Sequence, residues 1–178
     1  MIGGSADAPE LRAADKPVTL HALLTHTTGY PAGLKGDEQA LKRMEHIDPH
    51  GAADLRGFAE RMGQVPLAAD PGTRFGYDGA SLELLARVVE VVSGQSFESF
   101  LQQRIFDPLA MRDTGFSVPA AQRARVVDLT TMGKDGRLRI ADGPSAQHPG
   151  APLNAYASGA GGLYSTAGDY ARFAQMLL

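Results

Sequence analysis

Apolar residues recur at helical spacing in the first half of the chain. Between Gly51 and Gly63, apolar side chains stand at i, i+3, i+4 and i+7, namely Leu55, Phe58, Ala59 and Met62. That spacing places them on one face of an α-helix and leaves the charged residues on the opposite face. It predicts an amphipathic helix that packs on the protein core.

A second apolar run begins after Asp78, which is a suitable N-terminal cap, and stops at Gly94, a residue that often closes helices. Its buried stripe is expected to consist of Leu85, Val88, Val89 and Val92. Because Leu84 and Val91 are also apolar, we expect this helix to be buried on most sides.

A short helix is predicted over residues 19–27. Thr19 can cap its first turn, Gly29 can adopt the left-handed conformation that closes it, and the buried face is expected to carry Leu20, Leu23 and Leu24. The stretch between this helix and Gly51 is expected to be a polar, glycine-rich connection. Residues 66–76, with two prolines and two glycines, predict an extended, turn-rich segment.

Three more helices are predicted in the second half. One starts at Ser96 and is stopped by Pro108, and its inward side chains are Phe97, Phe100, Leu101 and Ile105. A short helix is expected over residues 120–125. The spacing Thr166-x-x-Asp169 resembles a capping box, which opens a last helix with one face formed by Tyr170, Phe173 and Leu177.

One strand pair is predicted from its turn. Residues 126–132 and 137–141 flank Gly133-Lys134-Asp135-Gly136, a strong hairpin signal, and residues 142–152 are loop-like. The pattern as a whole indicates an α+β chain that is mainly helical, with one small antiparallel ribbon.

Composition narrows the class of protein. With 178 residues, of which 43% are hydrophobic, the chain can form one packed domain over residues 1–178. A formal net charge of -3 gives no cationic surface for nucleic acid or for an anionic membrane. No stretch approaches the ~18 apolar residues of a membrane span, so the chain reads as soluble, while its compartment stays open.

Several kinds of reactive site are disfavoured by residue type and spacing. Cysteine is absent, which excludes a thiol nucleophile and a thiolate metal site. His21 and His26 are five residues apart, off the i, i+4 spacing of helical metal ligands, and His26 is expected to be a packed or capping residue. Residues 94–98 fail the Gly-x-Ser-x-Gly pattern, and no phosphate-binding loop is found. We therefore expect no metal and no cofactor.

Four segments carry longer motifs. Residues 19–30 read TLHALLTHTTGY, residues 71–79 read PGTRFGYDG, residues 105–116 read IFDPLAMRDTGF, and residues 158–173 read SGAGGLYSTAGDYARF. In this order they resemble the motifs TLxHLLTHTSGL, PGTxxxYSN, IFxPLGMxDTxF and SGGGGLxSTAxDxARF. These belong to the serine β-lactamase-like hydrolases: class C β-lactamases, family VIII esterases and D-alanyl-D-alanine peptidases.

The resemblance covers residues from about Leu11 to Leu178 and implies the helical domain and crossing segments of the β-lactamase/transpeptidase-like fold. The family's nucleophile lies in a Ser-x-x-Lys motif, yet none of the nine serines here is followed three residues later by lysine. The Lys-Thr-Gly motif is absent too. We therefore expect an interior fragment of such an enzyme.

Tyr77 is the catalytic residue that the resemblance implies, because it matches the tyrosine of the Tyr-x-Asn motif. A phenol with an ordinary pKa of about 10 needs a neighbouring positive charge before it can take a proton from a serine. Its place at the head of the helix that follows Asp78 supplies a helix dipole. The lysine of the missing motif would supply the rest. Residue chemistry alone favours the other interpretation, that Tyr77 is an aromatic side chain that packs at the helix head.

Three further residues are expected to line the substrate site by the same resemblance. Gly79 stands where the motif has asparagine, which disfavours a typical β-lactamase and favours the esterase branch. Ser158 and Gly161 belong to the glycine-rich segment that the family threads beside the acyl group, where glycine permits close approach. A flexible turn before a helix remains the alternative for this segment.

The sequence thus predicts part of a serine hydrolase that acts on a small ester, lactam or peptide through an acyl-serine intermediate. The chain alone is expected to be inactive, since its nucleophile is missing. Two alternatives stay open: a non-enzymatic interaction module, with a complementing chain of a split enzyme as its partner, and a gene remnant.

Overall fold

The computed structural model describes residues 3–178, apart from the side chains of residues 144–145, and the chain divides into two compact units. The first unit consists of residues 3–97 and 158–160, and the second of residues 98–157 and 161–178. Each unit has its own buried side chains, among them Phe58 in the first and Phe106 in the second. The expectation of one domain over residues 1–178 stays a prediction.

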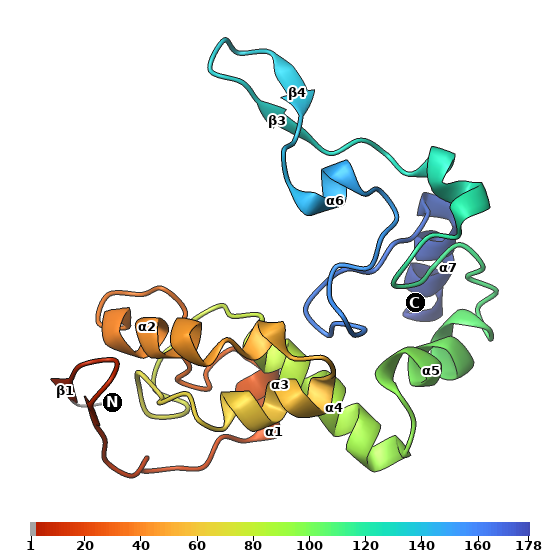
Figure 1. Ribbon diagram of the computed structural model, residues 1–178. Helices are drawn as coiled ribbons and strands as arrows, with labels where there is room; N and C mark the ends of the chain where they lie inside the picture. Colours follow the sequence, from red (N-terminus) through yellow and green to blue (C-terminus); the bar gives the residue numbers. More distant parts are fainter. Residues whose placement is uncertain (1–2) are drawn as a thin grey trace. The chain divides into compact units, whose positions relative to one another are not determined.

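The described part of the first unit is mainly helical. A ribbon of two short strands, β1 (Gly3–Gly4) and β2 (Pro9–Glu10), pairs antiparallel. The helices that follow are α1 (Leu20–Leu24), α2 (Glu38–Ile47), the 3₁₀ turn η1 (Pro49–Gly51), α3 (Leu55–Met62) and α4 (Ala80–Ser93). Helix α4 packs against α1 and α3, and α2 packs against α3 (Figure 1).

Helix α3 confirms the amphipathic pattern read from the sequence. Leu55, Phe58 and Met62 are at most 2% exposed, and they form the centre of the first unit. The helix begins after Asp54, whose carboxylate accepts a hydrogen bond from the Gly57 N–H at 2.7 Å. Burial of three large apolar side chains therefore anchors α3, and the cap defines where it starts.

Helix α4 has the predicted ends but not the predicted buried face. The Asp78 carboxylate accepts from the Ser81 N–H at 2.6 Å, and Gly94 closes the helix at φ 70°. The buried residues, however, are Ala80, Ser81, Glu83 and Ala86.

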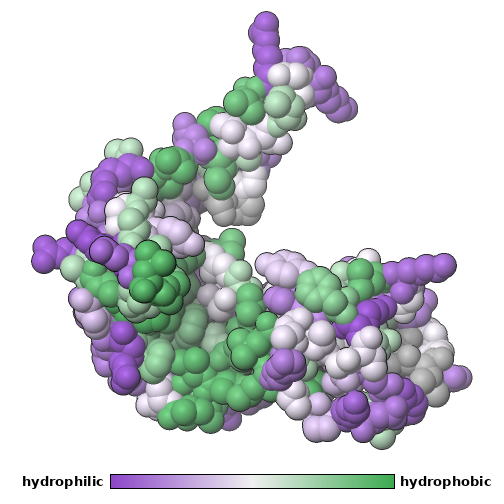
Figure 2. All heavy atoms as spheres, turned by 180° about the vertical axis from the view of Figure 1, so that it is seen from behind, coloured by the Kyte–Doolittle hydropathy of each residue, from purple (hydrophilic) through white to green (hydrophobic). Residues whose placement is uncertain are grey.

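Val91 and Val92 in its last turn are 65% and 82% exposed, so the prediction of burial on most sides was wrong. Figure 2, which shows the molecule from behind, also has exposed apolar side chains on its surface. The helix docks through the small and polar residues of its first half, and no described element covers these two valines.

Helix α1 is shorter than predicted. The Thr19 side chain caps it by accepting from the Ala22 N–H at 3.1 Å, as expected. The helix ends at Leu24 because His26 already adopts a left-handed backbone conformation, with φ 52°. Leu20 and Leu24 are 55% and 66% exposed, so the predicted leucine face was wrong and only Leu23 of the three is buried.

Helix α2 was missed, because residues 38–47 read as polar connection. Its position is set by the buried Asp37 carboxylate, which accepts from the Ala32 and Leu34 N–H groups and pairs with the Arg74 guanidinium. Burial alone would raise the pKa of Asp37, but the hydrogen bonds from Ala32, Arg74 and Leu34 outweigh it and hold the pKa below its ordinary value. The ion pair fixes the start of α2, and Ala40, Leu41, Met44 and Ile47 recur along it at helical spacing, a signal that the sequence reading overlooked.

The second unit begins with α5 (Phe97–Leu101), which continues as the π-turn η2 (Gln102–Phe106) and ends before Pro108, as predicted. The four side chains predicted to point inward, Phe97, Phe100, Leu101 and Ile105, are all half-buried. The turn η3 (Ala120–Arg125) confirms the predicted short helix. Four residues of the expected loop form the short helix α6 (Pro144–Gln147).

The predicted hairpin is present. Strands β3 (Thr130–Met132) and β4 (Leu138–Ile140) pair antiparallel, with Thr131 opposite Arg139. Together with the β1–β2 ribbon, the described chain has two small antiparallel ribbons, not the single one expected. The β1–β2 strands are two residues long and carry no alternating pattern, so the sequence offered no signal for them.

The last helix, α7 (Ala167–Met176), is capped as predicted, because the Thr166 side chain accepts from the Asp169 N–H at 3.2 Å. The buried Asp169 carboxylate also accepts from the Asp113 N–H at 2.7 Å and from the Thr114 hydroxyl at 3.0 Å. These bonds tie α7 to the segment after η2. Phe173 is half-buried, while Tyr170 and Leu177 are exposed.

Candidate functional site

Two of the motif segments form one structural piece in the first unit. The Gly72 N–H donates to the Thr27 carbonyl at 2.7 Å, and the Gly76 N–H donates to the His26 carbonyl at 2.9 Å. Gly29 lies at φ 83°, and a Cβ there would lie 2.1 Å from the Ala69 carbonyl oxygen. Only glycine permits this approach, so the segments after α1 and before α4 are locked side by side.

Tyr77 lies at the end of this piece, three residues before α4. Its side chain is 71% exposed. Its ring packs against the His26 imidazole, with ring centroids 4.7 Å apart and tilted by 44°. Among the described residues, no hydrogen bond or ion pair involves its hydroxyl. The phenol is therefore open to a substrate or to another part of an enzyme.

The dipole at the head of α4 is used by Asp78 and not by Tyr77. The Asp78 carboxylate accepts from the Ser81 N–H at 2.6 Å and from the Ser81 hydroxyl at 2.8 Å. The Asp78 N–H donates to His26 Nδ1 at 3.4 Å. His26 is thus a packed residue, as expected, and it joins the Tyr77 ring to the capped head of the helix.

Tyr30 is a second tyrosine in this region, and its phenol is held in the protonated form. Burial raises the pKa of Tyr30, and the negative charge of Asp78 adds to that shift. A phenol with a raised pKa does not ionise readily, and only the ionised form accepts a proton. Tyr77 remains the better candidate for a base, because its side chain is exposed whereas that of Tyr30 is half-buried.

Ser158 lies against α4 through a buried carboxylate. The Ser158 hydroxyl donates to Glu83 Oε1 at 2.5 Å, and the Gly159 N–H donates to Glu83 Oε2 at 2.9 Å. Ser158 Oγ in turn accepts from the Ala160 N–H at 3.1 Å. Ser158 is 5% exposed and Glu83 is 1% exposed. A buried serine with these bonds is a structural anchor of the segment and is not reachable as a nucleophile.

Gly79 faces this segment. A Cβ on Gly79 would lie 3.4 Å from the Ala160 Cβ, which is ordinary van der Waals contact. A Cβ on Gly159 would lie 2.2 Å from the Leu82 carbonyl oxygen and 2.8 Å from the Ala86 Cβ. The 158–160 segment therefore docks directly on the first half of α4 and reaches Gly79, two residues after Tyr77.

Gly161, the remaining predicted site residue, belongs to the second unit. A Cβ there would lie 3.7 Å from Leu153 Cδ2, an ordinary van der Waals contact. The structure thus brings Tyr77, Gly79 and Ser158 into one unit. A role for Gly161 in the same pocket wall stays a prediction.

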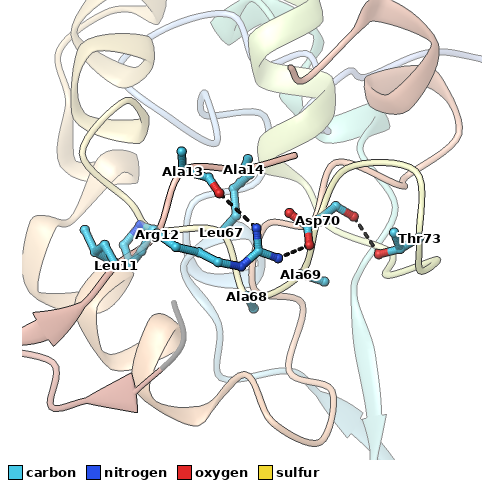
Figure 3. Close-up of a pocket in the computed structure, with 10 residues that line it drawn as sticks. Leu11, Arg12, Ala13, Ala14, Leu67, Ala68, Ala69, Asp70 and Thr73 are labelled. Atoms are coloured by element: carbon cyan, nitrogen blue, oxygen red, sulfur yellow. Dashed lines mark hydrogen bonds and ion pairs between the residues drawn. The ribbon is translucent and has the colours of Figure 1, made fainter. Parts of the chain in front are cut away.

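A cavity of about 470 Å³ lies elsewhere in the first unit, between the segment 11–14 and the segment 66–73 (Figure 3). Arg12 spans it and pairs with Asp70, as the dashed line in Figure 3 marks. The Thr73 hydroxyl donates to the Asp70 carbonyl at 2.6 Å. The hydrogen bond from Arg12 holds the pKa of Asp70 below its ordinary value. None of the predicted site residues lines this cavity, and its charged groups are already paired with each other.

Other kinds of site find no support in the described residues. No group of three or more His, Cys, Asp or Glu side chains that could hold a metal ion occurs among them. Within the same part of the chain, no helix is both long enough and apolar enough to cross a membrane.

Glu83 was missed by the sequence reasoning, although the sequence contains a signal for it. It lies three residues after Ala80 and three before Ala86, so it is on the helix face of these small residues and not on the outer, charged face. An acidic residue on a face of alanines needs hydrogen-bond donors when that face is buried. The partners could not be identified, because Ser158 and Gly159 are more than seventy residues away.

Comparison with known proteins places this geometry in a family. The family described as Beta-lactamase matches residues 8–178. Lovastatin esterase from Penicillium rubens is 34% identical over 92% of this chain and 40% of its own length. Esterase EstB from Burkholderia gladioli is 32% identical over 92% of this chain and 45% of its own length. The chain thus spans less than half of these relatives.

Solved structures show the same likeness. Unliganded selenomethionyl simvastatin synthase (LovD) from Aspergillus terreus superposes with a TM-score of 0.70 at 27% identity, over 94% of this chain and 40% of that one. The octameric penicillin-binding protein homologue from Pyrococcus abyssi gives a TM-score of 0.61 at 29% identity, over 94% and 36%. Because the Beta-lactamase family matches residues 8–178, nearly the whole of this chain, the chain belongs to the Beta-lactamase family.

Proposed function

We propose that this chain supplies the tyrosine base and one wall of an acyl-transfer site for a carboxylic ester. The observation that carries this is the exposed Tyr77 phenol, whose ring packs on His26 and which lies two residues before Gly79, the residue that faces Ala160 of the docked segment. A tyrosine in this place can take a proton from an attacking serine and return it to the leaving alcohol. The serine and its lysine would come from residues outside this sequence.

Two features favour esters over lactams. Gly79 has no side-chain amide with which to hold the acyl side chain of a lactam. Two of the relatives with the highest identities are named esterases, of lovastatin in one case. A D-alanyl-D-alanine-carboxypeptidase/endopeptidase, AmpH from Escherichia coli, is 29% identical over 91% of this chain, so peptides are the second class to test.

The chemistry assigned to this chain is proton transfer and positioning, with no cofactor. Serine attack on the ester carbonyl would release the serine proton to Tyr77, and the phenol would then protonate the leaving alcohol. Water would then attack the carbonyl of the acyl-serine and give its proton to Tyr77. The bond to the serine oxygen breaks, the carboxylic acid leaves, and the phenol returns the proton to the serine. Without a nucleophile the isolated chain has no hydrolase activity.

The first experiment measures turnover of p-nitrophenyl acetate and nitrocefin by the purified chain, which should equal the protein-free background.

The second experiment adds a complement that carries the remaining segments of esterase EstB. Ester turnover should appear, and Tyr77→Phe should lower it by about 10² or more, the usual contribution of a positioned base. Turnover by the chain alone that Tyr77→Phe abolishes would contradict the missing nucleophile. Complemented turnover that Tyr77→Phe leaves intact would contradict the base.

A non-enzymatic interaction module is the second candidate, favoured by the exposed apolar side chains of the first unit. Phe75 is 63% exposed and Val92 is 82% exposed. Large exposed apolar side chains are typical of surfaces that bind another protein. Size-exclusion chromatography with light scattering tests this, since a well-behaved monomer at high concentration would count against it.

A further inference from the structure

Glu83 is the one acidic side chain of α4 that is almost fully buried, at 1% exposure. Among the described residues, no lysine, arginine or histidine forms an ion pair with it. Its two oxygens are instead satisfied by the Ser158 hydroxyl and the Gly159 N–H. A buried carboxylate that accepts only from neutral donors depends on each of them, because an oxygen that loses its donor has no water to replace it.

The same two bonds set the position of a backbone segment. Ser158 receives the Ala160 N–H on its hydroxyl oxygen while it donates to Glu83, so three consecutive residues are ordered from one carboxylate. The segment they order contacts Gly79 at the head of α4, since a Cβ on Gly79 would lie 3.4 Å from the Ala160 Cβ. Gly79 is two residues from Tyr77.

We infer that Glu83 is a positioning residue, whose buried carboxylate sets the distance between the Tyr77–Gly79 head of α4 and the segment 158–160. The inference rests on the proposed function in one respect only, that these two pieces are walls of the acyl pocket. Glu83 does not touch the substrate. It acts through Ser158 and Gly159, and it sets the width of the space in which an acyl group would lie beside Tyr77.

Cross-linking measures this distance directly. The chain has no cysteine, so Gly79→Cys with Ala160→Cys creates the only pair of thiols. Their Cβ atoms would lie 3.4 Å apart, close to the 3.8 Å or so of a disulfide. The rate of disulfide formation under a mild oxidant then reports how often the two pieces are docked.

In this double-cysteine chain, Glu83→Ala should slow cross-linking by about tenfold, because both donors lose their acceptor. Glu83→Gln should restore most of the rate, since its amide oxygen can accept from the Gly159 N–H and its NH₂ can donate to Ser158 Oγ. Glu90→Ala is the matched control. Glu90 lies on the same helix and accepts from Arg87 and from the Phe97 N–H, away from the segment, so the rate should not change.

Ser158→Ala provides a second variant in case Glu83→Ala does not fold. It removes the hydroxyl that joins Glu83 to the Ala160 N–H and keeps the Gly159 bond, so an intermediate rate is expected. Equal rates in the parent, Glu83→Ala and Ser158→Ala chains would overturn the inference. So would an equal slowing by Glu90→Ala, which would mean that general loosening of α4 is responsible.

The outcome is separable from that of the proposed function. If the EstB complement shows no ester turnover while cross-linking depends on Glu83, the proposed ester hydrolysis is wrong and the positioning role of Glu83 stands. If turnover depends on Tyr77 but cross-linking is indifferent to Glu83, the activity stands and the positioning role is wrong. With both intact, Glu83→Ala without the cysteines should lower kcat in the complemented enzyme, and Glu83→Gln should recover it.

Discussion

The two halves of helix α4 are opposite in character. In the first half, Ser81 and Glu83 are buried and hydrogen-bonded, whereas Val91 and Val92 in the second half are exposed. A hydropathy scale would predict the opposite, with the valines buried and the serine and glutamate exposed. Burial along a helix therefore follows what packs against it. Neighbouring donors make polar burial tolerable, and valines without a neighbour stay in solvent.

The most direct test of this contrast is to separate the first half of α4 from the segment it contacts. Gly159→Ala places a Cβ 2.2 Å from the Leu82 carbonyl oxygen, and the backbone must move to make room for it. We expect a loss of about 3 kcal/mol in the free energy of unfolding, measured in urea. Gly161→Ala is the control in the same loop. Its new Cβ meets only Leu153 Cδ2, at 3.7 Å, and its effect should stay within about 0.5 kcal/mol.

Asp37 extends the contrast, because it is a buried carboxylate that has a cation as well as backbone donors. Asp37→Asn should cost about 2 kcal/mol near neutral pH through loss of its charge-assisted bonds to Arg74, Ala32 and Leu34. Urea unfolding measures this cost.

The pH dependence of Asp37 has a definite sign. Since the folded pKa of Asp37 is lowered, its contribution is present above the ordinary value of about 3.9 and is lost as the pH falls through the folded value. The parent should therefore lose more stability than Asp37→Asn between about pH 5 and pH 2. Parallel acid curves for the two proteins would mean that the carboxylate is not paired in solution.

Ser81 tests whether the polar contacts of the first half are worth more than ordinary helix contacts. Ser81→Ala removes the hydroxyl that donates to Asp78 and should cost about 1 kcal/mol. Ser93→Ala removes a hydroxyl that donates to the Val89 carbonyl of the same helix, and its cost should be smaller. Thermal unfolding of both variants decides, and an equal loss would erase the distinction between the halves.

The smallest effect is expected in the second half. Val92→Ser should change the free energy of unfolding by less than about 0.5 kcal/mol, because the side chain is already 82% exposed. The substitution should also reduce self-association in light scattering if the module alternative is correct. A large destabilisation of a monomeric chain would show that Val92 is covered in solution, and the contrast within α4 would then fail.

Features set by neighbouring residues were predictable from the sequence. The caps at Thr19, Asp78 and Thr166, the buried face of α3 and the β3–β4 hairpin each depend on contacts within a few residues, which the order of amino acids specifies directly. The motifs likewise identified Tyr77, Gly79 and Ser158 as candidates from the order of amino acids alone.

Only the folded chain decided which surfaces are covered and which distant groups meet. The start of helix α2 is fixed by an ion pair between Asp37 and Arg74, and the segment at Ser158 is ordered by Glu83, across 37 and 75 residues of chain. Such pairs leave no periodic trace in a sequence, because one carboxylate can serve donors from any segment that the fold brings near. Exposure of the α4 valines has the same cause, since periodicity identifies an apolar face but not whether anything packs on it.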